Sequence, residues 1–480
     1  MFVTPLDLWR RSPHEQGGVP RLWYLNPGTQ EFWERVQKRA RVASLWDRDR
    51  QSAFPRTPLL ITGKVERAAC ETISLLTSIE SPLSQNRAPM GKKRNSAMRR
   101  ERLFDLHPRE VVDTDVMVIG GGIVGLATAY YLAKRGRRVA VLERSTFGFE
   151  ASGRTAAGVR QQGRDLRELP LAMASVALWA DLDDELQDQT YYRRSGNIFI
   201  AVSADEMAKF QAATEQERSA GLYVEMLDRD RLKHMVPSLS DRCLGGKHCP
   251  SDGMAEPWAV IRALVAAITR HGGRLYPNTE ALDFVVQGDR VVSVLTDTIE
   301  FRPEVTVNAA GPWAALLATR VGVTLPIRPF PAQLIETEQV ELRCDGFLVF
   351  PGEAVYCRPT ISGCIHFGPI SVLTPRDVMK SPSQLSPVAQ VRTKIASLIP
   401  ALGGVHIRRA WMGLLDVTPD TLPIIGPVPG LSNYIVAAGF SGHGFGLGPG
   451  VGSALSALIV DGRPSIPLQA FSLSRFASAQ

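Results

Sequence analysis

The chain has 480 residues, of which 44% are hydrophobic and 21% are charged, so it is long enough for two or three globular domains of about 150 residues each. The formal net charge at pH 7 is +7, and much of the excess lies in one basic stretch before residue 110. A modest charge placed in this way argues against a nucleic-acid-binding protein.

Residues 1–112 differ in character from the rest of the chain. They are rich in arginine and proline, contain a basic run over Lys92–Arg102, and support one short predicted helix over Glu31–Leu45. A charge run of this kind is most often a solvated linker. We therefore predict a poorly structured and dispensable N-terminal extension, with Met98 close to the start of the globular part.

A strand, a glycine-rich turn and a helix come next. Asp115–Ile119 is continuously apolar, as buried parallel strands are. Ile123–Arg135 has the apolar periodicity of a helix that ends at Gly136, and Val139–Leu142 is the next predicted strand. Together these elements predict a βαβ unit of about 30 residues.

The turn of this unit is a GxGxxG motif. Its first glycine permits a tight turn, its second lets a pyrophosphate approach the backbone, and its third allows close helix–strand packing. The N–H groups at the helix start attract phosphates, and Glu143 stands where a carboxylate accepts hydrogen bonds from ribose hydroxyls. The residues predicted to hold a dinucleotide here are Gly120, Gly122, Ile123, Val124, Gly125, Glu143 and Arg144.

The following segment, residues 151–160, is dominated by small side chains. Such a loop suits an extended pyrophosphate and an isoalloxazine, and it adds Ser152, Thr155 and Ala156 as cofactor contacts. The glycine motif, Glu143 and this segment together resemble the D-amino-acid oxidase superfamily, which includes glycine oxidase, sarcosine oxidase and opine oxidase subunits. The resemblance implies an α/β fold, in which a Rossmann-like FAD-binding domain is interleaved with a mixed-sheet substrate domain.

Helices and strands alternate through the middle of the chain. Helices are predicted over Leu166–Leu186, Asp205–Ala220, Pro257–His271 and Ala389–Leu398, and strands over Gly196–Ile200, Glu304–Asn308 and Tyr434–Ala438. Residues 280–302 alternate like an antiparallel meander, and 328–408 read mainly as strands. A last helix is predicted over Gly450–Val460.

Two later segments also resemble this family. Residues 307–313 resemble the strand-to-helix crossing beside the adenosine half of FAD, where Gly311 permits a close backbone approach and Pro312 can begin a helix. Residues 411–426 and 439–446 resemble its closing flavin motif, whose helix N-terminus stabilises the charge of the reduced ring. The additional FAD contacts that the resemblance implies are Ala310, Gly311, Gly413, Gly442, His443, Gly444 and Phe445.

The mode of FAD attachment and the domain limits also follow from the resemblance. Monomeric sarcosine oxidases tether FAD through a cysteine at the position of Gly413, and some heterotetrameric ones tether FMN to a histidine that residues 252–257 lack. We therefore expect non-covalent FAD.

The expected limits are 113–200, 255–327 and 409–465 for the FAD domain, 201–254 and 328–408 for the substrate domain, and 466–480 for a tail.

Four side chains are candidates for the substrate site. In the family, an arginine on a substrate-domain strand often clamps the substrate carboxylate in a bidentate fashion. Arg358 is the first candidate for this clamp, although a surface salt bridge would also explain it, and Tyr356 is a candidate for the pocket wall. Arg160 is a second possible anion clamp. His443 is a candidate acid or base at the flavin edge.

The expected function is FAD-dependent oxidation of the C–N bond of a small amine or amino acid, which could be a D-amino acid, a glycine- or sarcosine-like compound or an opine. Hydride transfer to flavin N5 would give an imine that hydrolyses, with oxygen or a carrier as the electron acceptor. The alternatives are oxidation of a 2-hydroxy acid or polyol, and a flavoprotein subunit that acts as an assembly partner.

A cytoplasmic enzyme without a metal site is expected. No apolar run reaches the roughly 18 residues of a membrane span, and the N-terminus lacks the apolar segment of a secretory signal. The scattered cysteines form no CxxC pair, so neither a zinc site nor a disulfide framework is indicated. They are Cys70, Cys243, Cys249, Cys344, Cys357 and Cys364.

Overall fold

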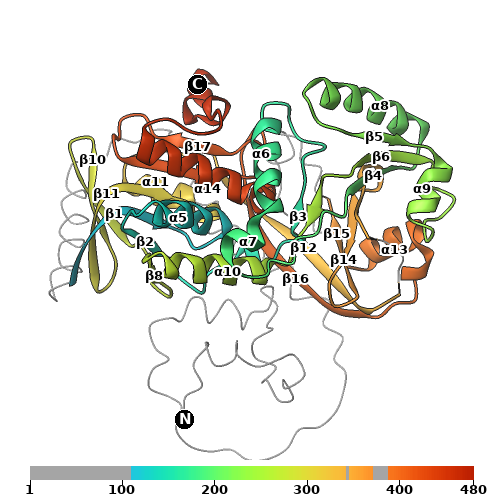
Figure 1. Ribbon diagram of the computed structural model, residues 1–480, viewed down its shortest axis with the longest axis horizontal. Coiled ribbons are helices and arrows are strands. Elements are labelled where there is room, and N and C mark those ends of the chain that lie inside the picture. Colours follow the sequence, from blue (N-terminus) through green and yellow to red (C-terminus); the bar gives the residue numbers. More distant parts are fainter. Residues whose placement is uncertain (1–109, 342–344, 371–387, 480) are drawn as a thin grey trace, which may run out of the picture. The chain divides into compact units, whose positions relative to one another are not determined.

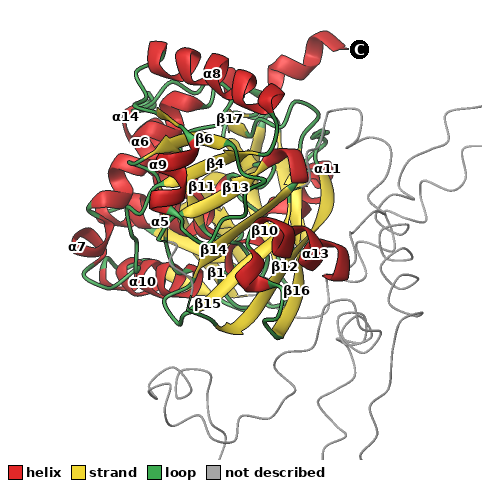
Figure 2. Ribbon diagram, turned by 90° about the vertical axis from the view of Figure 1, so that its right-hand side faces the viewer, coloured by secondary structure: helices red, strands yellow, loops and turns green. Residues whose placement is uncertain are grey.

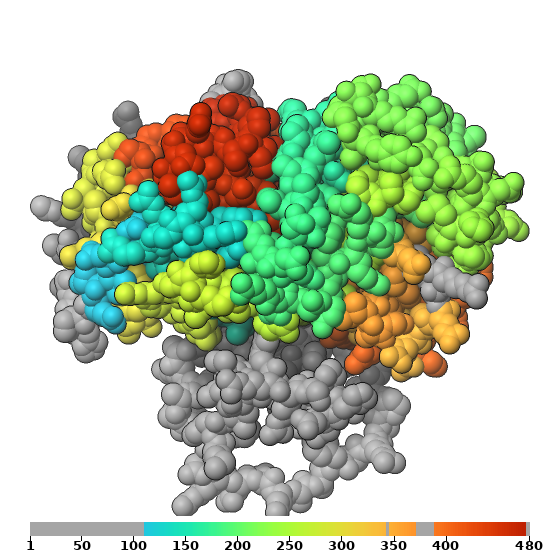
Figure 3. Space-filling view, viewed as in Figure 1, coloured from blue at the N-terminus to red at the C-terminus, as the bar shows by residue number. Residues whose placement is uncertain are grey.

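The computed structural model describes residues 110–341, 345–370 and 388–479. Residues 1–109 of the expected extension, with the predicted helix over Glu31–Leu45, lie outside the described residues. The described part contains two eight-stranded sheets and a small two-stranded one. In the space-filling view, the segments of the first sheet and its helices gather on one side, and the green and orange segments of the second gather on the other (Figure 3).

The first sheet has the parallel centre of a nucleotide-binding domain. Its strands are β1 Glu110–Ile119, β2 Val139–Leu142, β8 Arg274–Tyr276, β9 Asp283–Gln287, β10 Arg290–Leu295, β11 Ile299–Asn308, β17 Ile424–Pro427 and β18 Tyr434–Ala438. The order is β17-β18-β11-β1-β2-β8, with β17 antiparallel at one edge and the other five strands parallel. β9 and β10 add the predicted antiparallel meander beside β11.

Helices cover both faces of this sheet. They are α5 Ile123–Lys134, α6 Leu169–Ala180, α7 Leu182–Leu186, α10 Pro257–Arg270, α11 Ala314–Arg320 and α14 Gly444–Asp461. α5, α10 and α14 lie side by side against one face (Figure 1) and share an apolar core with α6 and α7. α11 and the meander pack on the other face. Burial on both faces explains why the last four residues of β1, β2 and β18 are continuously apolar.

Helix α14 begins at Gly444 instead of the predicted Gly450, although Pro449 lies inside it. Proline has no N–H group and its ring disturbs the preceding turn of a helix. The Ser175 side chain of α6 compensates, because its Oγ donates to the Gly446 carbonyl at 2.7 Å and accepts from the Gly450 N–H at 3.0 Å. α14 is long and apolar enough to cross a membrane, but 61% of it is buried, as expected for a core helix.

The second sheet is mixed, as expected for a substrate domain. Its strands are β4 Asn197–Ala201, β5 Glu225–Leu227, β6 Gly245–Cys249, β12 Arg328–Gln339, β13 Phe347–Phe350, β14 Val355–Pro359, β15 Cys364–Pro369 and β16 Ile407–Val417. The order is β16-β12-β15-β14-β13-β4-β6-β5. β4 and most of β16 were expected in the FAD domain, but β4 pairs with β13 and β6, and β16 pairs with β12 along its length.

Helices flank this sheet on its outer side, and a short ribbon joins the two halves. The helices are α8 Ala204–Ser219, α9 Arg229–Met235 and α13 Val388–Leu398, which pack against β6, β14 and β15 (Figure 2). The ribbon pairs β3, Gly158–Val159, with β7, Gly253–Met254. The predicted helix over Leu166–Leu186 is divided at Asp181 into α6 and α7.

Candidate active site

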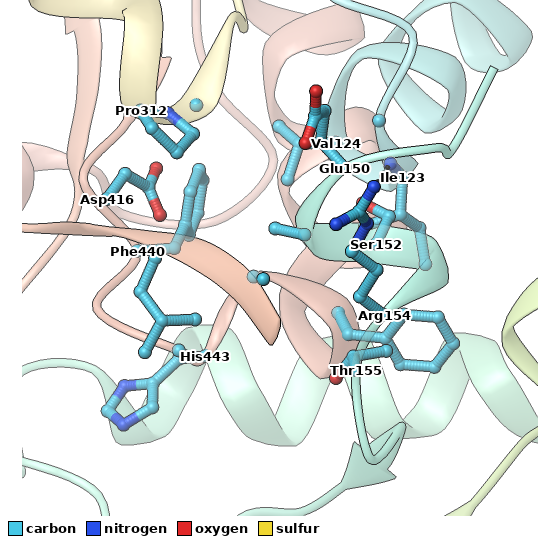
Figure 4. A pocket seen from close by; sticks show the side chains of 18 of the residues that line it. Ile123, Val124, Glu150, Ser152, Arg154, Thr155, Pro312, Asp416, Phe440 and His443 are labelled. Carbon is cyan, nitrogen blue, oxygen red and sulfur yellow. Dashed lines mark hydrogen bonds between the residues drawn. The ribbon is translucent and has the colours of Figure 1, made fainter. Parts of the chain in front are cut away.

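A cavity of about 510 Å³ lies between the two sheets. Figure 4 shows Asp416, Phe440 and His443 along one side of it and Ile123, Ser152 and Arg154 along the other. It is lined by the turn after β1, the loop 148–156, the segment 309–313 and the turn before α14, which are the segments that the sequence singled out. Every predicted cofactor residue lines it except Gly125, which packs behind the turn.

Two positions in the turn after β1 have no space for a side chain. Gly120 has φ +113°, and a Cβ there would lie 2.3 Å from the Ala309 carbonyl oxygen. A Cβ on Gly125 would lie 2.0 Å from the Gly120 carbonyl oxygen. Only glycine therefore fits at these two positions. Helix α5 begins close to the cavity, where the N–H groups of its first turn are available for phosphates.

Polar groups at this end of the cavity suit a dinucleotide. The Glu143 carboxylate accepts hydrogen bonds from the N–H groups of Gly121 at 3.0 Å and Ser145 at 2.7 Å, and burial raises its pKa. Ser152 Oγ accepts from the Ile123 N–H at 3.0 Å. No acidic side chain stands in the first turn of α5, where it would repel a pyrophosphate. These residues fit FAD: Glu143 would hold the ribose, and the N-terminus of α5 would face the phosphates.

Arg144 and Trp313 close the same end of the cavity. The guanidinium carbon of Arg144 lies 3.5 Å from the centroid of the Trp313 ring, and its Nη2 lies 2.8 Å from Glu150 Oε1. Trp313 belongs to η4, Gly311–Trp313, which begins at the predicted Ala310–Gly311 contact. No local sequence pattern indicates this stacking, because its two partners are distant in the chain.

Asp416 fixes the conformation of the turn before α14 through hydrogen bonds. It was not among the site residues predicted from the sequence. Asp416 Oδ2 accepts the N–H of Gly439 at 2.7 Å, and its carbonyl accepts the N–H of Ser441 at 2.9 Å. Burial raises the pKa of Asp416 to about 6. The turn then presents Gly442 and the start of α14 to the cavity, as the family resemblance implied.

The other end of the cavity has an apolar wall formed by strands of the second sheet. Tyr356 lines it as predicted, and its ring stacks on Phe347 with centroids 5.6 Å apart. Burial raises the pKa of Tyr356, so its hydroxyl is neutral at ordinary pH. Phe199 of β4 and Val349 of β13 complete the wall. Sequence alone did not show which face of these strands would meet the cavity.

Arg160 places a cation at this apolar end. Its guanidinium carbon lies 5.8 Å from the Phe199 ring centroid, and its Nη1 donates to the Gln162 carbonyl at 3.0 Å. Within the described residues no carboxylate forms an ion pair with Arg160. Two other arginines that line the cavity are paired, Arg144 with Glu150 and Arg164 with Glu168. Burial, followed by the neighbouring Arg164, lowers the pKa of Arg160 to about 9.

Two buried carboxylates hold the loop that carries Arg160. Asp252 Oδ1 accepts the N–H of Gln161 at 2.7 Å, and Glu217 Oε1 accepts the N–H of Gly163 at 2.6 Å. Glu217 is itself paired with the buried Lys247 at 2.7 Å. The loop geometry is therefore fixed independently of any ligand.

The structure does not bring Arg358 to the cavity, so its assignment as the carboxylate clamp is not supported. Its side chain is 0% exposed and does not line the cavity. Nη1 lies 3.0 Å from Glu256 Oε1, and Nη2 lies 3.5 Å from His366 Nδ1. Because Glu256 already neutralises it, Arg358 ties the second sheet to the start of α10 instead of binding substrate.

His443 lines the cavity as predicted, and it contacts a carboxylate that the sequence analysis missed. Its Nδ1 lies 2.9 Å from Oε2 of Glu168, at the N-cap of α6, and Arg164 Nη1 lies 3.4 Å from the same oxygen. Glu168 stands inside a predicted helix, where nothing in the local pattern distinguishes it from a surface carboxylate.

The fold and the cavity are those of an FAD-dependent oxidoreductase. The family model described as DAO, FAD dependent oxidoreductase, matches residues 115–458, and the chain belongs to this family. The predicted family, fold class, enzyme class and FAD cofactor are thereby confirmed.

Relatives cover most of the described chain. Glycine oxidase of Geobacillus kaustophilus is 30% identical over 374 residues, which are 75% of this chain and 97% of the relative. Hydrogen cyanide synthase subunit HcnC of Pseudomonas aeruginosa is 26% identical, over 75% and 96%. The crystal structure of L-proline dehydrogenase from P. horikoshii superposes with a TM-score of 0.71 at 28% identity, covering 77% of this chain and 99% of that one.

Proposed function

We propose that the protein oxidises the C–N bond of a small amine that carries a carboxylate, such as an amino acid or an N-alkyl amino acid. The observation that carries the proposal is Arg160, a half-buried cation at the apolar end of the cavity without an ion-pair partner among the described residues. The names of two similar proteins, glycine oxidase and L-proline dehydrogenase, agree with a substrate of this class.

In this proposal the protein binds and orients the substrate. Arg160 binds the carboxylate, and the buried contacts of Asp252 and Glu217 with its loop keep the guanidinium in place. Phe199, Phe347 and Tyr356 exclude water from the substrate carbon. When bound, FAD would supply the two-electron acceptor for this oxidation. The imine product then hydrolyses to an oxo acid and an amine or ammonia.

Anaerobic mixing of the FAD-loaded protein with a matched panel tests this function. The panel holds an amino acid, its N-methyl derivative, the 2-hydroxy acid with the same carbon skeleton, and the amine that lacks the carboxylate. We expect the flavin band to bleach with one or both of the first two compounds only. Bleaching by the hydroxy acid alone would favour the alternative chemistry, and bleaching by the bare amine would remove the role of the carboxylate.

Non-covalent attachment, a partner subunit and a cytoplasmic location remain proposals. Gly413 lies against the Arg154 side chain on the cavity wall and offers no thiol for a flavin bond. One similar protein, HcnC, is named as a subunit of a larger enzyme, which supports a search for a partner that accepts the electrons. Release of all FAD into the supernatant after acid denaturation is the expected result for non-covalent binding.

A further inference from the structure

A buried charge cluster lies behind the wall of the cavity at His443. Glu168 is 0% exposed, and its Oε2 lies between His443 Nδ1 at 2.9 Å and Arg164 Nη1 at 3.4 Å. The His443 side chain keeps 21% of its surface accessible, on the cavity side of this cluster. The proposed function gives no role to these three groups.

The charges in the cluster decide the state of the imidazole. Burial opposes ionisation of Glu168, but His443 and Arg164 outweigh burial and lower its pKa, so the carboxylate is charged. Burial lowers the pKa of His443, and Arg164 lowers it further. Because Arg164 supplies the countercharge to Glu168, the imidazole is neutral at ordinary pH. Because Nδ1 is the ring nitrogen beside Glu168, we expect it to carry the proton of the neutral imidazole, which would leave the lone pair on Nε2.

We propose that His443 accepts a proton from the substrate ammonium group at Nε2, and that Glu168 is the residue that positions His443 for this step. The proposal rests on the proposed function, because it concerns an amino acid that arrives as a zwitterion. One ammonium N–H bond breaks, an Nε2–H bond forms, and the electron pair stays on the substrate nitrogen. The neutral amine is the form that can be oxidised, and Glu168 stabilises the imidazolium until its proton passes to water.

The carboxylate anchor and this cluster belong to one rigid segment. Arg164 Nε donates to the Arg160 carbonyl at 3.3 Å, so the residue that holds Glu168 is bonded to the residue that would bind the carboxylate. A substrate held at Arg160 is therefore presented to the wall that carries His443. Arg160 and Arg164 on this segment and Glu168 on α6 are the charged groups that act on His443.

Two other carboxylates near the cavity titrate in the acid range, so their titrations must be distinguished from that of His443. Burial raises the pKa of both Asp416 and Asp252 to about 6. Asp416 bonds to the backbone of the turn before α14, and Asp252 bonds to the loop of Arg160. Glu168 is not among the groups that act on either, so removal of Glu168 should move the titration of His443 alone.

The test is the pH dependence of anaerobic flavin reduction by an active amino acid, compared for wild type, Glu168→Gln, His443→Asn and Asp165→Asn. Glu168→Gln should lower the reduction rate on the order of tenfold or more and move its acid limb to lower pH, because loss of the carboxylate lowers the imidazole pKa. Asp165→Asn is the matched control, since Asp165 pairs with Arg167 at the surface, one turn from Glu168. It should leave both rate and limb unchanged.

If Glu168→Gln loses FAD, the His443→Asn variant provides an independent test of the proposal. Asparagine is a good N-cap residue, so α14 should be preserved. The reduction rate should fall about 100-fold at neutral pH and recover at high pH, where the substrate amine is already neutral. A rate within twofold of wild type at neutral pH, or an unmoved acid limb in a folded Glu168→Gln protein, would overturn the proposal.

A spectroscopic measurement tests the same idea without turnover. The ¹⁵N shifts of His443 in the oxidised holoprotein, assigned by comparison with His443→Asn, should show a proton on Nδ1 in the wild type and a mixture of tautomers in Glu168→Gln. A proton on Nε2 in the wild type would contradict the proposal. If no carboxylate-bearing amine bleaches wild-type flavin, the proposed function itself fails, which is a different result from any of these.

Discussion

Arg358 Nη1 and Glu256 Oε1 lie 3.0 Å apart, and this ion pair joins a strand of the second sheet to the residue before α10. Arg358 is completely buried, whereas Glu256 is 20% exposed. A charge buried in this way is stabilised only while its partner remains, because water cannot replace the carboxylate. The pair therefore makes Arg358 a residue of structure and not of substrate binding.

Arg358→Ala should accordingly lower the free energy of unfolding by about 3 kcal/mol, while the substrate affinity of the folded protein stays the same. Urea unfolding and anaerobic substrate titration measure the two quantities. Arg231→Ala is a suitable comparison, because Arg231 forms an exposed pair with Glu225 whose loss should cost less than about 1 kcal/mol. A stable Arg358→Ala protein with weak substrate binding would restore the clamp assignment.

Arg160→Ala should have the opposite effect, lowering substrate affinity instead of stability. Loss of the hydrogen bonds from a half-buried guanidinium to a substrate carboxylate should weaken substrate binding roughly 10- to 100-fold, with FAD content unchanged. Arg160→Lys should recover only part of the affinity, because an ammonium group cannot bind a carboxylate in bidentate fashion. The measurement is the substrate concentration at half-maximal flavin bleaching, with the exposed Arg167→Ala as control. Equal values in all four proteins would exclude Arg160 as the anchor.

The elements that the sequence predicted well are those with a local cause. In the turn over residues 120–125, Gly120 has a positive φ and Gly125 packs against the Gly120 carbonyl oxygen five residues earlier, so a short motif was sufficient. The partner of Arg358 lies 102 residues earlier in the chain, and no local pattern indicates that the two will meet. The same applies to β16, which was assigned to the wrong domain because only its pairing with β12 reveals its sheet.

Gly125→Ala should abolish FAD retention. The new Cβ would lie 2.0 Å from the Gly120 carbonyl oxygen, so the turn must move away from α5 and from the phosphate site. The ratio of flavin to protein absorbance after gel filtration, with FAD added in excess, measures the effect. Gly404→Ala is the matched control, since a Cβ there meets no atom within 4 Å. Full flavin content in Gly125→Ala would show that this turn does not hold the cofactor.

Trp313→Ala should speed the dissociation of FAD without abolishing binding. The stacking of Arg144 on Trp313 at 3.5 Å closes the dinucleotide end of the cavity. A cation–π contact of about 1–2 kcal/mol corresponds to a roughly 5- to 30-fold faster release. Stopped-flow recovery of flavin fluorescence on dilution gives the rate. Arg144→Ala and the double variant should each match Trp313→Ala, and additive effects would mean that the two residues act separately.

Asp416→Asn should change how stability depends on pH. Burial raises the pKa of Asp416 from its ordinary value of 3.8 to about 6, so the folded protein binds this proton more tightly than the unfolded chain does. Its contribution is therefore fully present below about pH 4 and is lost as the pH rises through about 6. The wild type should lose about 3 kcal/mol relative to Asp416→Asn across this interval, since one pKa unit is worth about 1.4 kcal/mol.

Urea unfolding of both proteins at pH values between about 4 and 7.5 measures this difference. Asparagine cannot titrate, but its side-chain oxygen can still accept the N–H of Gly439, so the turn before α14 should keep its shape. Asp252, whose pKa is also about 6, is present in both proteins and cancels in the comparison. Parallel stability curves would mean that Asp416 is already charged at pH 5, and that the turn tolerates a buried carboxylate because its N–H groups stabilise the charge.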